Sequence, residues 1–91
     1  GGENVWPDPV ERLLTADPRV AEVAVIGRPD PEWGQQVTAV VVPVDVADPP
    51  SLDALRELVK AELPAWCAPR ALELATSLPR TALGKVRRRQ L

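Results

Sequence analysis

Apolar residues at helical spacing predict a first helix that begins near residue 8. Asp8 is placed to cap this helix, Pro9 suits its first turn, and Glu11 stands where a capping box needs a carboxylate. The apolar residues that share one face of the helix are Val10, Leu13 and Leu14. The residue before a proline avoids helical geometry, so we expect the helix to end before Pro18.

A second amphipathic pattern begins after the proline-rich stretch 45–50. Ser51 is a favoured N-cap residue, and Pro64 marks the point that the helix cannot pass. The apolar residues that form a stripe along this helix are Leu52, Leu55, Leu58, Val59 and Leu63. The pattern predicts a helix with one buried face.

Three other segments have the composition of strands. Residues 20–26 are rich in β-branched side chains and lead into a Gly/Pro/Asp stretch at 27–31, which predicts a strand that ends in a loop. Residues 37–44 are almost all apolar, as in a central strand covered on both faces. Residues 71–74 alternate like a half-exposed strand.

The order helix, strand, strand, helix, strand predicts an α+β fold. We expect a small sheet of about three strands packed with helices, then a turn centred near Leu83 and Gly84, and a basic helical tail over 85–91. The length of 91 residues fits one domain with a single core.

Composition excludes several kinds of site. A net charge of −2 gives no general attraction to nucleic acid. The chain contains no histidine and a single cysteine, Cys67, which argues against a zinc site, an internal disulfide or a histidine-based triad. Because Cys67 has no partner cysteine for an internal disulfide, we expect a reducing, cytoplasmic setting. No apolar run approaches the roughly 20 residues that cross a bilayer, so we expect no membrane insertion. The start at Gly1, without methionine, favours a fragment of a longer protein.

The segment around Lys85 is the best candidate for chemistry. A lysine after a glycine at a turn is most often a solvated surface residue. It can also deliver one positive charge to a phosphate or carboxylate held by another domain. The neighbouring Arg87, Arg88 and Arg89 are most simply a solvated helix face, although they could guide a nucleotide or contact another domain.

Three blocks in order resemble the C-terminal domain of adenylate-forming acyl-CoA synthetases, the AMP-binding enzyme family. Residues 79–86 (PRTALGKV) are similar to the family's P-x-T-x-x-G-K-V/I signature. Residues 1–7 (GGENVWP) resemble its segment after the interdomain hinge, and residues 20–34 resemble a further block that ends in Trp-Gly. The resemblance covers nearly the whole chain.

This resemblance implies that residues 1–91 form a mobile lid domain and that a large N-terminal adenylation domain is absent from the chain. Such acid–thiol ligases join a carboxylic acid to ATP as an acyl-adenylate and then transfer the acyl group to CoA. Lys85 falls on the family's catalytic lysine. The implied partners are ATP, CoA, the acid and the large domain, which would hold Mg²⁺. The isolated chain is expected to be inactive.

The resemblance also implies a CoA-binding surface. The residues it assigns to CoA are Gly1, Gly2, Glu3, Trp33, Trp66 and Arg70. The first three would line the pantetheine tunnel, the tryptophans would meet the nucleotide, and Arg70 would meet its 3′-phosphate. The glycines could instead be a simple hinge, and each tryptophan could simply cover the core. Cys67 and Ala68 depart from the family pattern, which weakens the expected phosphate contact.

Several functions therefore stay open. Segment 68–70 and the proline-rich middle are similar to o-succinylbenzoate–CoA synthetases of menaquinone biosynthesis. Medium-chain fatty or aromatic acyl-CoA synthetases are alternatives for the acid. Cys67 and Ala68 also leave open a ligase whose acceptor is a carrier protein. A module that binds nucleotides or a protein without catalysis is the remaining alternative.

Overall fold

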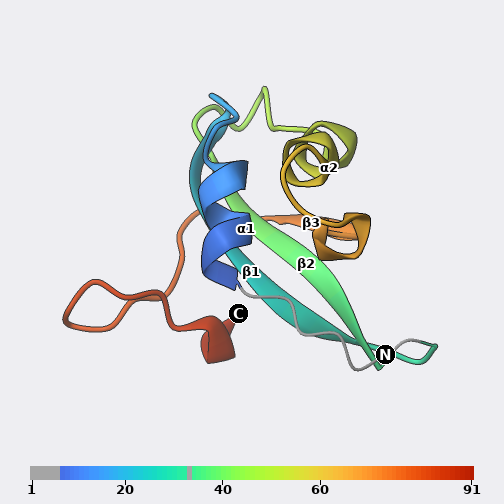
Figure 1. The fold of residues 1–91 in the computed structure, drawn as a ribbon. Coiled ribbons are helices and arrows are strands. Elements are labelled where there is room, and N and C mark those ends of the chain that lie inside the picture. Colours follow the sequence, from blue (N-terminus) through green and yellow to red (C-terminus); the bar gives the residue numbers. More distant parts are fainter. Residues whose placement is uncertain (1–6, 33) are drawn as a thin grey trace.

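The computed structural model describes residues 7–32 and 34–91, which form a three-stranded sheet with two helices (Figure 1). The elements are α1 (Pro7–Leu14), β1 (Val20–Asp30), β2 (Gly34–Pro43), α2 (Leu52–Lys60) and β3 (Ala71–Leu74), with single 3-10 turns at Ala65–Cys67 and Arg88–Gln90. The α+β prediction is confirmed.

Strand β2 lies at the centre of the sheet. It pairs with β1 in antiparallel register, from Val20 opposite Pro43 to Asp30 opposite Gly34. It pairs with β3 in parallel register, and α2 lies in the connection between these two strands. Residues 38–41 of β2 are buried in unbroken succession, so both faces of the strand are covered, as the sequence predicted.

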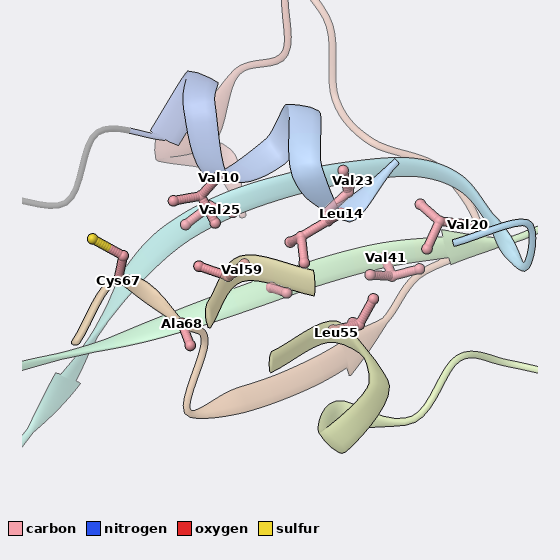
Figure 2. Close-up of a cluster of buried hydrophobic side chains, with 11 residues drawn as sticks. Val10, Leu14, Val20, Val23, Val25, Val41, Leu55, Val59, Cys67 and Ala68 are labelled. Carbon is pink, nitrogen blue, oxygen red and sulfur yellow. The ribbon is translucent and has the colours of Figure 1, made fainter. Parts of the chain in front are cut away.

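Both helices pack on one face of the sheet and form the larger core (Figure 2). The buried residues of this core are Val10, Leu14, Val20, Val23, Val25, Ala39, Val41, Leu55, Val59, Cys67 and Ala68. Cys67 therefore packs as a small apolar side chain. Helix α2 begins as predicted, because the Ser51 hydroxyl accepts a hydrogen bond from the Ala54 amide at 3.1 Å.

The opposite face of the sheet is covered by residues 75–91, here called the C-terminal arm. Leu78 is buried against Ala24 and Val40, and Val86 and Leu91 pack at the edge of this second cluster. Figure 1 shows the arm, coloured orange to red, extending beyond the sheet as a loop and returning to end near α1. The arm carries Lys85, so this packing connects the candidate site to the sheet.

Three local predictions are wrong. Helix α1 begins at Pro7, before the predicted cap at Asp8, and Glu11 contacts β1 rather than completing a capping box. Strand β1 continues through 27–30 because β2 pairs with it as far as Asp30, and an edge strand tolerates glycine and proline. The tail 85–91 contains only one 3-10 turn. Val86 instead pairs with Arg80 in an isolated bridge, which is incompatible with a helix there.

Candidate functional site

Lys85 follows a tight turn that depends on one glycine. Gly84 has a φ of +86°, a conformation that side-chain-bearing residues rarely adopt. Its amide donates to the Thr81 carbonyl at 2.9 Å. The Thr81 amide donates to the Lys85 carbonyl at 2.7 Å, and the Thr81 hydroxyl accepts from the Lys85 amide at 3.1 Å. Thr81 therefore fixes the backbone of Lys85 from two sides.

The turn presents its side chains to solvent. Lys85 is exposed, and Leu83 beside it is 90% exposed. Among the described residues no ion pair involves the Lys85 ammonium, whereas four of the arginines are ion-paired. The turn thus holds an exposed positive charge on a backbone that is well ordered by hydrogen bonds.

Arg80 ties the base of this turn to the sheet. Its Nη1 donates to the Gly84 carbonyl at 2.9 Å, and its Nη2 forms an ion pair with Glu22 of β1. Next to the Arg80–Val86 bridge, the Arg87 amide donates a hydrogen bond to the Pro79 carbonyl at 2.7 Å. The two sides of the turn are therefore bonded to each other and to β1.

Arg88 does not lie on the solvated helix face that the sequence predicted, but is ion-paired with helix α1. Its guanidinium binds the carboxylate of Glu11, with Nη2 at 2.8 Å from Oε1, and contacts Asp8 at 3.2 Å. Arg87 is exposed, and the side chain of Arg89 lies outside the described part of the structure. Arg88 is therefore held by carboxylates of α1, whereas Arg87 is open to solvent.

A third arginine holds the end of the arm. Arg28 binds Glu73 through two hydrogen bonds of 2.9 and 2.7 Å, and its Nη1 donates to the Leu91 carbonyl at 2.6 Å. The hydrogen bond from Arg28 holds the pKa of the Glu73 carboxyl below its ordinary value. This pair joins β1 and β3 to the last residue of the arm.

Trp66 and Arg70, two of the residues predicted to bind CoA, lie on another part of the surface. Trp66 lies on the 3-10 turn Ala65–Cys67, is 44% exposed and belongs to neither core cluster. Arg70 is exposed, and its amide donates to the Val37 carbonyl at 2.8 Å. Gly1, Gly2, Glu3 and Trp33 lie outside the described residues.

Arg70 lines a shallow, open pocket at the edge of the sheet and α2. The residues that line this pocket are Asp30, Glu32, Gln36, Leu52, Asp53, Arg56 and Arg70. Neither Lys85 nor Trp66 is among them. Two arginines face three acidic side chains, so this surface is of mixed charge. Arg56 also donates to the Pro69 carbonyl at 2.8 Å, which fixes the backbone before Arg70.

Sequence reasoning missed Arg80, Arg88 and Arg56 as partners of the candidate residues. Two of these contacts join distant positions, because Arg80 is 58 residues from Glu22 and Arg88 is 77 residues from Glu11. For Arg80 alone the sequence offered a hint of a role, because it lies inside the turn motif of residues 79–86. No cluster of three or more possible metal ligands occurs among the described residues. No helix in that part of the chain has the length and apolar character to cross a membrane.

Comparison with known proteins gives consistent matches over the whole chain. The family described as "AMP-binding enzyme C-terminal domain" matches residues 9–85. An indoleacetate–CoA ligase from Aromatoleum aromaticum is 44% identical over 97% of the chain, and a probable 2-succinylbenzoate–CoA ligase from Mycobacterium tuberculosis is 44% identical over all of it. The chain spans only 17% and 24% of these two relatives.

Among solved structures, an o-succinylbenzoate CoA synthetase from Bacillus subtilis, in complex with its acyl-adenylate intermediate, superimposes with a TM-score of 0.86. It is 36% identical to the chain, and the match covers 99% of this chain and 18% of that structure. The predicted resemblance is confirmed by sequence and by fold.

Proposed function

The chain belongs to the AMP-binding enzyme C-terminal domain family, and from this membership we propose that it is the mobile lid domain of an ATP-dependent carboxylic acid–CoA ligase. In this proposal a large N-terminal domain binds ATP, the acid and Mg²⁺. The lid would present one surface during formation of the acyl-adenylate and another during transfer of the acyl group to CoA.

The observation that carries this proposal is the ordered turn with an exposed Lys85. As a carboxylate approaches the α-phosphate of ATP, two anions are brought together and negative charge builds up on the phosphate oxygens. A lysine ammonium placed beside them stabilises this arrangement more than it stabilises the separated substrates. Thr81 and Arg80 fix the backbone before Lys85, so little reordering of the turn is needed.

We propose that Trp66 and Arg70 serve the second step. An exposed indole can stack on the adenine of CoA, and a guanidinium can bind its 3′-phosphate. Lys85 is not among the residues that line the pocket beside Arg70, which is compatible with a lid that uses different surfaces for the two steps. The assignment of Gly1, Gly2, Glu3 and Trp33 to CoA remains a prediction.

For the acid we propose an aromatic carboxylate, with o-succinylbenzoate, a precursor in menaquinone biosynthesis, as the first candidate. A relative named for this acid and a relative named for indoleacetate are equally similar to the chain, and both names denote aromatic acids. The full-length enzyme should be offered o-succinylbenzoate, indoleacetate and a medium-chain fatty acid. Preference for the fatty acid would contradict the proposal.

Lys85 is tested by acid-dependent exchange between ATP and pyrophosphate, which requires only the first step. Lys85→Ala in the full-length enzyme should lower this exchange by roughly a hundredfold or more, as the loss of a transition-state charge contact does. Lys60→Ala is the matched control, because Lys60 makes only a surface ion pair with Glu57 at 3.3 Å. Equal exchange in both variants would refute the role of Lys85.

The acceptor is tested separately. The full-length enzyme should form a thioester with free CoA, and the 91-residue chain alone should form none because the proposed ATP and acid sites belong to the large domain. Transfer to a carrier protein but not to millimolar CoA would identify the carrier-dependent alternative.

A further inference from the structure

The arm that carries Lys85 is bound to the rest of the domain at a second point, three residues beyond the lysine. Arg88 Nη2 lies 2.8 Å from Glu11 Oε1 and 3.0 Å from Oε2, and Arg88 Nε lies 3.3 Å from Oε2. The same Nη2 lies 3.2 Å from Asp8 Oδ1. Arg88 thus reaches helix α1 with several charge-assisted hydrogen bonds.

Glu11 is itself held in place by the sheet. Its Oε2 accepts a hydrogen bond from the Val25 amide at 2.7 Å, and its side chain is 17% exposed. Strand β1 is at the edge of the sheet, where amide groups that point outward need partners from outside the ladder. One carboxylate therefore joins α1, β1 and the C-terminal arm.

This contact differs from an ordinary surface ion pair, which contributes little because two long side chains must be ordered in water. Glu11 is already ordered by Val25, and a forked guanidinium holds a carboxylate in a defined direction. The hydrogen bonds inside the turn fix its shape. Its orientation relative to the sheet depends on contacts at its two ends, namely Arg80 with Glu22 and Arg88 with Glu11.

We infer that Arg88 is a positioning residue for Lys85, and that its contact with Glu11 sets where the arm presents the lysine ammonium during adenylate formation. This inference rests on the proposed function of Lys85. Catalysis by a fixed charge is sensitive to displacements of about 1 Å, so a loosened arm should slow adenylate formation. The second step, which uses another surface, should not change.

Arg88→Gln removes the charged fork, while the packing of Leu78, Val86 and Leu91 against the sheet remains. In the full-length enzyme we expect acid-dependent ATP–pyrophosphate exchange to fall about tenfold, and thioester formation from preformed adenylate to stay at the wild-type rate. Glu11→Gln should also lower exchange, because it removes the negative charge that Arg88 binds. The amide oxygen of the glutamine can still accept the hydrogen bond from the Val25 amide, so the contact with β1 is kept. Arg88→Lys should restore part of the exchange.

Arg12→Gln is the matched control, because Arg12 neighbours Glu11 on α1, is exposed and makes no ion pair with a described residue. It should leave both steps unchanged. Thermal unfolding of each variant checks that it is folded. If Arg88→Gln does not fold, Arg88→Lys and Glu11→Gln carry the same comparison of the two steps.

The decisive comparison places Arg88→Gln in a Lys85→Ala background. A residue that acts through Lys85 should cause no further loss of exchange there. A further tenfold loss, or an equal loss in both steps for the single variant, would overturn the positioning role. If Lys85→Ala itself leaves exchange unchanged, the proposed function of Lys85 fails. If Lys85→Ala lowers exchange but Arg88→Gln does not, only the present inference fails.

Discussion

Gly84→Ala should perturb the Lys85 turn through the backbone alone. Gly84 has a φ of +86°, and a Cβ added there would meet no atom within 4 Å. Steric overlap with surrounding atoms therefore contributes nothing to the cost. The remaining cost is that of holding alanine in a left-handed conformation, about 1–2 kcal/mol.

Gly34→Ala is a closely matched control. Gly34 has a φ of +81° and equally open surroundings, but it lies at the β1–β2 hairpin rather than in the arm. Urea unfolding of the 91-residue chain should show a similar loss of stability for both variants, up to about 1–2 kcal/mol. A smaller loss for Gly84→Ala would mean that the turn opens locally instead.

In the full-length ligase, only Gly84→Ala should lower ATP–pyrophosphate exchange. If the turn opens to relieve the strain, a cost of about 1–2 kcal/mol lowers the ratio of formed to open turn by roughly five- to thirtyfold. Exchange should fall by up to that factor, while Gly34→Ala keeps the wild-type rate. Equal exchange in the two variants, together with a smaller urea loss for Gly84→Ala that shows an opened turn, would refute the view that the geometry of this turn places Lys85.

Three further predictions concern other parts of the domain. Hydrogen bonds from Arg19 hold the pKa of Asp17 below its ordinary 3.8, so the carboxylate stabilises the fold above that pH and loses this effect as the pH falls through the lowered pKa. Asp17→Asn should therefore unfold at a lower urea concentration near pH 7. Its free energy of unfolding should also fall less steeply than that of the wild type between about pH 5 and pH 2, and an equally steep fall would contradict this. Leu55→Ala empties a fully buried core position and should cost about 3–4 kcal/mol in urea unfolding, and a loss below about 1 kcal/mol would argue against the packing of α2. Arg70→Ala in the full-length enzyme should raise the KM for CoA roughly tenfold without changing ATP–pyrophosphate exchange, and an unchanged KM would remove Arg70 from the CoA surface.

Local sequence signals predicted the elements whose formation depends on neighbouring residues. Ser51 caps α2 through the Ala54 amide, and the run 38–41 is buried on both faces of the sheet. The glycine before Lys85 adopts the positive φ that a turn requires. In each case the residue types themselves restrict the backbone or exclude water, so the pattern is sufficient.

Contacts between distant segments could not be predicted in the same way. Residues 27–30 read as a loop because they contain glycine and proline, yet pairing with β2 keeps them in the strand. The basic run 87–89 read as a helix face, yet Arg88 binds Glu11 from a position 77 residues away. Strand pairing and long-range ion pairs depend on the assembled fold, and one sequence contains no local signal for them.

The central claim is that Lys85 serves adenylate formation and not acyl transfer. Its most direct test is a single-turnover measurement on the Lys85→Ala full-length enzyme, supplied with preformed acyl-adenylate and CoA. We expect thioester to form at nearly the wild-type rate, although ATP–pyrophosphate exchange by the same preparation is lowered by roughly a hundredfold. A loss of thioester formation as large as the loss of exchange would contradict the claim.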